Sequence, residues 1–202
     1  MSSGRLHMTS EDSYVKVLGG FYMASSVNTS SSSSFSILSD GVLEVQGDFE
    51  QIVGSVYNFR GGGNHEVVFS GNGRQVVKFE NPDNSYFNSI AFRNTSEEGV
   101  DFQTPVQARG TFKSNGSVVK NAPGGRLVED ASVQGSLAIN YDGIQLNGFD
   151  LTLSGDLIHS GGLVNVDAGR LTVGGDYRIQ SVEGEGYGVS SCLLYTSPSP
   201  RD

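Results

Sequence analysis

The chain has 202 residues, of which 28 are glycine and one is cysteine, and its formal net charge is −9. Glycine at about twice its usual share leaves little material for long helices, which argues against an all-helical protein. With only 13 Lys and Arg residues, the chain lacks the clustered positive charge that nucleic acids and anionic membranes require, and no apolar run approaches the ~20 residues of a membrane span.

A seven-residue pattern recurs at residues 15–21, 43–49, 106–112, 131–137, 151–157 and 171–177, and its copies align on one glycine each. The residues four before, two before and two after this glycine are always apolar, whereas the residue three before it is polar. Such alternation predicts a strand with one buried face. The glycines are predicted to form structural corners: Gly19, Gly47, Gly110, Gly135, Gly155 and Gly175. The residues two positions later are predicted to form one core column: Phe21, Phe49, Phe112, Leu137, Leu157 and Tyr177.

The spacing of these glycines predicts the architecture. Successive glycines are 28, 63, 25, 20 and 20 residues apart, and 63 is close to three units of 20. A unit of this size fits one coil of a solenoid, in which each coil stacks about 4.8 Å above the previous one. The sequence therefore predicts an all-β fold, a parallel β-helix (β-solenoid) of roughly 20-residue coils. Asp48, Asp156 and Asp176 follow three of the glycines and are expected to bond nearby backbone N–H groups.

The segments between the repeats add strands, turns and one loop. A serine run at 30–34 predicts an exposed loop. Segments 66–69 and 75–79 flank a glycine-rich stretch, which predicts either a hairpin or two sides of one coil. Residues 86–92 and 100–102 supply further strand material, and turns are expected at 115–116 and 122–125.

The last eleven residues, 192–202, match a translated sequencing adapter. Codons resembling a transposase mosaic end followed by a library adapter translate to CLLYTSPSPRD in this order. The alternative is a natural disordered tail rich in Ser and Pro. We therefore expect residues 1–191 to be one β-solenoid module truncated at both ends, and residues 192–202, with the one cysteine, to be an artefactual tail.

Several segments resemble a tandem module of very large surface or secreted proteins from anaerobic, mostly Gram-positive bacteria. They are GRLHMTSEDSYVKV (4–17), LEVQGDFEQ (43–51), NHEVVFSG (64–71), SYFN (85–88) and LTVGGDYRIQ (171–180). The resemblance covers most of residues 4–191 and departs at the serine run. It implies a β-solenoid stalk beside adhesive or toxin-bearing domains, with neighbouring repeat modules as partners. It also implies an extracellular or cell-surface location, although residues 1–11 lack the pattern of a signal peptide.

The sequence holds little that points to catalysis. His7, His65 and His159 lie far apart, without metal-ligand spacing, and Gly61–Gly63 lacks the lysine and the following helix of a phosphate loop. Three Asp residues beside the motif glycines could bind calcium if they stacked, but three of the six copies lack Asp there, which favours a turn-capping role. We therefore predict no catalytic residue, no metal site and no cofactor.

The pattern leaves three functions open. The leading one is a non-catalytic structural module that acts as a stalk or scaffold and contributes an adhesive face to a surface glycan or protein. The second is a polysaccharide lyase or glycosidase on a β-helix, with Glu97, Glu98, Asp101 and Arg109 as the nearest candidates. The third is a passive stalk of a toxin-delivery protein.

Overall fold

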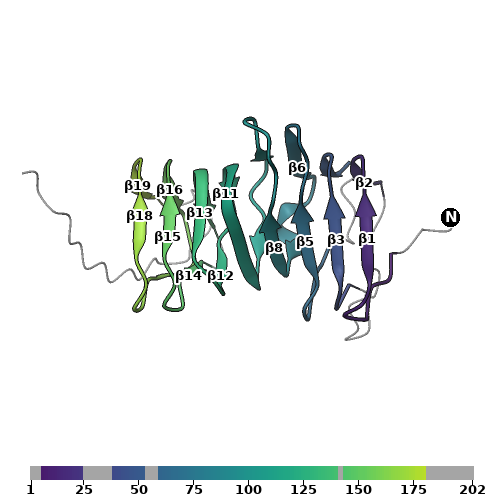
Figure 1. Cartoon of the computed structure of the whole chain (residues 1–202), viewed down its shortest axis with the longest axis horizontal. Coiled ribbons are helices and arrows are strands. Elements are labelled where there is room, and N and C mark those ends of the chain that lie inside the picture. The colour runs from purple at the N-terminus through teal and green to yellow at the C-terminus, as the bar shows by residue number, and fades with distance from the viewer. Residues whose placement is uncertain (1–5, 25–37, 53–58, 141–142, 181–202) are drawn as a thin grey trace, which may run out of the picture.

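The computed structural model describes residues 6–24, 38–52, 59–140 and 143–180. These residues form strands stacked side by side along one long axis (Figure 1), and the named strands pair in parallel throughout. The helical content described is one short 3-10 turn, η1 (Pro82–Asn84), so this part of the chain contains no helix long and apolar enough to cross a membrane. The predicted parallel β-helix is confirmed. The serine run at 30–34 and the tail at 192–202 lie outside the described residues.

The strands form three faces around the axis. The first face consists of β1 (Tyr14–Val17), β3 (Val42–Val45), β5 (Glu66–Phe69), β8 (Ser89–Phe92), the first part of β11 (Thr111–Ala122), β12 (Gly125–Leu127), β14 (Ile144–Gln145) and β17 (Val164–Asn165). The second face consists of β2 (Phe21–Met23), β4 (Phe49–Gln51), β6 (Gln75–Phe79), β9 (Val100–Phe102), the second part of β11, the last part of β13 (Ala131–Ile139), β16 (Leu157–His159) and β19 (Tyr177–Ile179). β15 (Leu151–Leu153) and β18 (Leu171–Val173) pair with the first part of β13 and lie before the bends at Gly155 and Gly175, whereas β16 and β19 lie after them. The third face consists of β7 (Tyr86–Phe87) and β10 (Gln107–Ala108), extended by a bridge from Arg60 to Tyr86.

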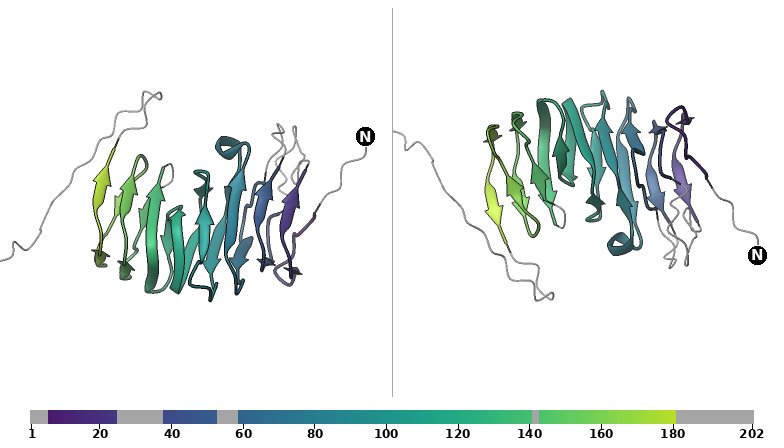
Figure 2. Two further views of the ribbon diagram at one scale, coloured as in Figure 1. Left: turned by 90° about the horizontal axis from the view of Figure 1, so that it is seen from above. Right: turned by 90° about the horizontal axis from the view of Figure 1, so that it is seen from below.

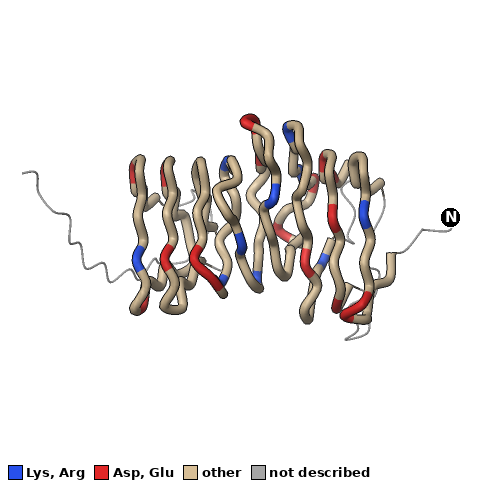
Figure 3. Tube along the Cα trace, viewed as in Figure 1, with Lys and Arg blue, Asp and Glu red and all other residues tan. Residues whose placement is uncertain are grey.

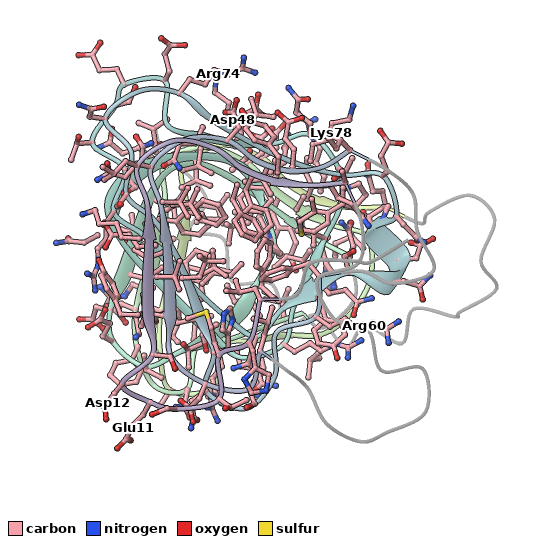
Figure 4. The ribbon with its side chains drawn as sticks, turned by 90° about the vertical axis from the view of Figure 1, so that its right-hand side faces the viewer. Glu11, Asp12, Asp48, Arg60, Arg74 and Lys78 are labelled. Carbon is pink, nitrogen blue, oxygen red and sulfur yellow. The ribbon has the colours of Figure 1, made fainter. Side chains whose placement is uncertain are left out.

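The core fills the space that these faces enclose. Seen along the axis, the ribbon surrounds densely packed side chains (Figure 4). Inward positions on the first face stack as Leu43, Val67 and Ile90, all fully buried. The predicted alternation of apolar and polar residues is therefore the alternation of inner and outer positions.

The second face carries most of the predicted core column. Phe21 pairs with Phe49 at one end of the stack, and Leu137, Leu157 and Tyr177 follow one another at the other end. Between these two groups the column runs through other residues, in the register pairs Phe49 with Val77, Val77 with Phe102, and Ala122 with Leu137.

The prediction that Phe112 belongs to this column is wrong. Phe112 lies on the first face, where it pairs with Ile90 on one side and Leu127 on the other. Its repeat copy is displaced by one face, because Gln107 and Ala108 of the same copy already form the third face. This copy has the same local pattern as the others, but its pairing with the neighbouring coils places it on the third and first faces.

Coil length differs between the two halves of the stack. From Leu137 to Leu157 to Tyr177 each coil takes 20 residues, as predicted. From Phe21 to Phe49 to Val77 each takes 28, and the second of these coils contains Arg60, which bridges to Tyr86 on the third face. Figure 2 shows the same stack from two further sides.

Four of the predicted corner glycines form bends that stack on one another. The Gly47 N–H donates to the Gly19 carbonyl at 2.9 Å, and the Gly175 N–H donates to the Gly155 carbonyl at 3.0 Å. A side chain at Gly47 would place its Cβ 2.6 Å from the backbone of Gly19, which explains the requirement for glycine. The Gly155 N–H in turn donates to the Gly135 carbonyl at 2.8 Å. The predicted stacking therefore holds for Gly19 with Gly47 and for Gly135, Gly155 and Gly175.

The other two predicted corners differ in their local conformation or partner. Gly135 lies inside β13 with a φ of +145°, and a Cβ there would come within 1.8 Å of the Val119 carbonyl oxygen. It is therefore a close-approach site within a strand. Gly110 is a bend, but its N–H donates to the carbonyl of Asn88, a residue outside the repeat pattern.

Two of the remaining local predictions are decided by the strand pairing. Strands β5 and β6 lie on different faces, so they are two sides of one coil and not a hairpin. The turn expected at Asn115 and Gly116 is instead an irregularity within β11, where the register with β13 shifts and Gly116 has a φ of +76°.

The aromatic packing around Phe49 gives a test of the core. Phe49 is fully buried, with five aromatic rings 5.0–6.0 Å from its centroid. Replacing it by alanine removes these contacts and leaves a cavity, so Phe49→Ala is expected to lower the free energy of unfolding by about 3–5 kcal/mol. Urea denaturation followed by circular dichroism measures this loss.

The matched control is Phe21→Ala in the neighbouring coil. Phe21 is only partly buried, and its ring contact is with Phe49. The loss should be clearly smaller than for Phe49→Ala. Equal losses for the two variants would contradict the described core.

Candidate functional site

An open groove of about 640 Å³ runs along the stack beside the first face. Successive coils each contribute to its lining, so its long direction follows the axis. It is lined by Glu11, Asp40, Gly41, Val42, Gly63, Asn64, Glu66, Asn88, Ser89, Ala108, Arg109, Gly110, Thr111, Lys113, Gly125, Arg126 and Gln145.

Glycines keep part of the groove free of side chains. Gly41 and Gly63 have φ values of +78° and +54°, which L-residues with a side chain rarely adopt. A Cβ at either position would lie within 2.4 Å of the carbonyl oxygen of Ser13 or Ser39 in the preceding coil. The tight stacking at this corner therefore produces the hollow, and the motif glycine Gly110 lies in the same lining.

The charged lining residues divide the groove into two halves. The acidic half holds Glu11 and Asp40 in the first coils, and the cationic half holds Arg109 and Arg126 further along the stack. Along the stack as a whole, acidic and basic positions follow one another with both signs represented (Figure 3).

Two of the lining cations are held by neighbouring side chains. The Lys113 Nζ lies 2.6 Å from the Glu66 Oε1, an ion pair that joins the two halves of the groove. The Arg109 guanidinium lies 3.7 Å from the centre of the Tyr86 ring and donates to the Gln107 Oε1 from Nη2 at 2.7 Å. These contacts fix the direction of the Arg109 side chain while leaving the residue exposed.

The acidic residues that the sequence offered for catalysis are not in this groove. Asp101 is ion-paired with Arg74 at 2.6 Å, and Glu97 and Glu98 lie in an exposed turn. Viewed along the axis, Arg74 projects from one corner of the cross-section and Glu11 from another (Figure 4). Arg109 lines the groove with Glu11, so the structure does not assemble the four candidates.

The three histidines have separate surroundings. His7 is exposed, His65 is buried in the core, and His159 contacts the Tyr177 hydroxyl at 3.2 Å and the Gly162 carbonyl oxygen at 3.1 Å. Among the described residues, no group of three or more His, Cys, Asp or Glu side chains is arranged to hold a metal ion.

The Asp residues beside the motif glycines bond the backbone of the next coil. Asp48 Oδ1 accepts the Val76 N–H at 2.8 Å, and Asp156 Oδ1 accepts the Asp176 N–H at 2.9 Å. The expected backbone bonding is confirmed for Asp48 and Asp156.

A second Asp ladder was not predicted. Asp130 Oδ1 accepts the Asp150 N–H, and Asp150 Oδ1 accepts the Arg170 N–H, both at 2.9 Å and 20 residues apart. The 20-residue spacing of Asp130 and Asp150 was the available signal in the sequence.

Glu44, on the outer side of β3, is the centre of a polar cluster that sequence reasoning missed. Its carboxylate accepts hydrogen bonds from Ser70 Oγ at 2.6 Å and from the Tyr14 hydroxyl, and it pairs with Lys16 Nζ at 2.9 Å. The bonds from Ser70, Tyr14 and Lys16 lower the pKa of Glu44 to about 2. The cluster links three successive coils across the first face.

Comparison with known proteins adds no relative. No family model, no curated protein and no solved structure matches this chain. The groove and the polar clusters are therefore interpreted from their own geometry.

The Glu44 cluster predicts a defined pH dependence. Because the folded-state pKa lies below the ordinary value of 4.5, the ionised carboxylate stabilises the fold above pH 4.5, and this contribution is lost as the pH falls toward 2. Glu44→Gln should lower the free energy of unfolding by about 2 kcal/mol at pH 7, with a difference that shrinks toward zero near pH 2. Urea titrations at several pH values measure it. Glu129→Gln, at an exposed position, should show no such difference, and a constant deficit of Glu44→Gln across the range would contradict the cluster.

His65 is a group whose removal should stabilise the fold in acid, whereas removal of Glu44 should destabilise it at neutral pH. It is fully buried, neither ring nitrogen has a hydrogen-bond partner among the described residues, and burial lowers its pKa to about 4 despite the charge of Asp40. The unfolded chain takes up the proton first, so stability should fall by up to about 3 kcal/mol between pH 6.5 and pH 4.

His65→Phe removes this titration and keeps a ring beside Phe59, whose centroid lies 6.0 Å away. We expect the variant to be more stable than the parent by a margin that grows from pH 6.5 to pH 4, as measured by thermal unfolding. His7→Phe, at an exposed site, is the control. A parent and a His65→Phe variant with parallel pH profiles would show that His65 is not buried as a neutral ring.

Proposed function

We propose that this chain is a non-catalytic structural repeat module of a bacterial cell-surface or secreted protein, acting as a stalk or scaffold. The observation that carries the proposal is the parallel register that links each coil to the next from β1 to β19. A stack of this kind gives a defined length and stiffness and spaces whatever lies at its two ends.

The outermost described coils support neighbouring repeat modules as partners. Within the described residues, β1 and β2 pair only with β3 and β4, and β18 and β19 pair only with β15 and β16. The inward side chains of these end coils, such as Val15 and Leu171, are only partly buried, whereas their counterparts Leu43 and Leu151 are fully buried. Coils of the same kind stacked on either end would complete their burial.

The location of the parent protein rests on the resemblance of the repeats to bacterial surface and secreted modules. The passive stalk of a toxin-delivery protein is a variant of the same proposal. It differs only in the domains that the stalk would carry, and the mechanical role of this chain is the same in both cases.

A second candidate function, an adhesive face, is favoured by the groove. A surface that follows several coils and presents amide, hydroxyl and charged side chains suits an extended polar ligand. The competing enzyme hypothesis requires a pair of carboxylates at a cleavable bond. The separation of Asp101 from the groove and its ion pair with Arg74 weigh against it.

Turnover assays distinguish a scaffold from an enzyme. Incubation with polygalacturonate and with mixed-linkage glucan, followed by assay of reducing ends and unsaturated products, should show no turnover above background. Glu66→Gln and Asp101→Asn test the two acidic sites, and Glu129→Gln is the matched surface control. Turnover that either of the first two variants abolishes and the control retains would overturn the scaffold proposal.

A further inference from the structure

We infer that the groove beside the first face binds a glycan strand, with uronate carboxylates in its cationic half and neutral sugar hydroxyls in its acidic half. The inference rests on the adhesive face proposed above and names its ligand class, while the stalk role stands or falls independently of it.

The composition of the groove points to a polyhydroxylated ligand. Ligand pockets are usually lined by apolar and aromatic side chains, whereas here Val42 and Ala108 are the apolar side chains among the lining residues. Peptide partners generally need apolar anchor sites, which this lining does not offer. Asn64, Asn88 and Gln145 supply amide donors and acceptors along the same path.

The shape of the groove points to an extended strand. Neighbouring coils follow at about 4.8 Å, so polar groups recur along the axis at nearly constant steps. This step is close to the length of one pyranose unit in an extended chain. A glycan strand lying along the axis can therefore repeat similar contacts from coil to coil.

The cationic half points to carboxylates. On a chain of net charge −9, Arg109 and Arg126 lie in one stretch of the lining, beside Lys113, whose charge is paired with Glu66. Stacking on Tyr86 and the bonds to Gln107 hold the Arg109 fork in place, so less freedom is lost on binding. No hydrogen bond or ion pair joins the exposed Arg126 guanidinium to another described residue, which makes Arg126 the principal carboxylate contact.

The acidic half sets the position of the ligand. Glu11 and Asp40 would repel a carboxylate, but their oxygens accept hydrogen bonds from sugar hydroxyls. A short uronate segment is therefore confined to the cationic half, and a longer strand must place neutral units beside Glu11.

Isothermal titration calorimetry with trigalacturonate tests the inference on the full chain. Trigalacturonate should bind, and its fully methyl-esterified form, which has the same shape without the charges, should bind about tenfold more weakly or not at all. Arg126→Gln should weaken trigalacturonate binding about tenfold, as expected for one lost charge-assisted contact. Arg170→Gln, which removes the same charge from an exposed site outside the groove, should leave binding unchanged.

A longer probe tests the acidic half. Hexagalacturonate reaches beyond the cationic half, so Glu11→Gln should strengthen its binding several-fold while leaving trigalacturonate binding unchanged. Urea unfolding of each variant establishes that it is folded. Three results would overturn the inference: no heat of binding with millimolar trigalacturonate, equal binding of the acid and its ester, or equal losses in Arg126→Gln and Arg170→Gln.

Discussion

Stacking in parallel register is the constraint on which the rest of this molecule depends. Because neighbouring parallel strands lie about 4.8 Å apart, each side chain is in contact with its counterpart in the coils above and below. Most inward positions are therefore apolar, as in Leu43, Val67 and Ile90. Bends must repeat the same backbone, as Gly155 and Gly175 do, and a side chain at Gly175 would collide with the coil of Gly155.

The same constraint governs the polar groups. A buried or half-buried polar side chain finds its partners in adjacent coils, since these are the nearest backbone and side-chain groups. The Asp156 carboxylate accepts the Asp176 N–H of the next coil, and Glu44 accepts hydrogen bonds from the coils on both sides. The buried Gln75 side-chain amide donates to the carbonyls of Val45 and Gly47. His65 is an exception, because neither of its ring nitrogens has a hydrogen-bond partner among the described residues, and this makes it an acid-sensitive point in the core.

The features that could be predicted from the sequence are those that depend on residues close to one another in the chain. The period of two identified the inward residues, and the regular 20-residue spacing at the C-terminal end identified the coil, since Leu157 and Tyr177 stack as expected. Phe112 was misplaced because its copy matches the pattern locally, while its face is decided by Ile90 and Leu127, which lie in other coils. The groove could not be predicted for the same reason, because coils of unequal length bring its lining residues together.

The placement of Phe112 is the most direct test of this account, because it separates the stacking register from the local repeat. Lys113 follows Phe112 and pairs with Ala91 on the first face. If all six repeat copies shared one column, Lys113 would instead lie beside Ala138, which follows Leu137. With Cys192 replaced by serine, the double variants Ala91→Cys/Lys113→Cys and Lys113→Cys/Ala138→Cys can be oxidised under mild conditions and examined by mass spectrometry. Adjacent strands satisfy the Cα separation of a disulfide, so the account predicts an intramolecular disulfide in the first variant and none in the second. A disulfide in the second variant, with free thiols in the first, would contradict it.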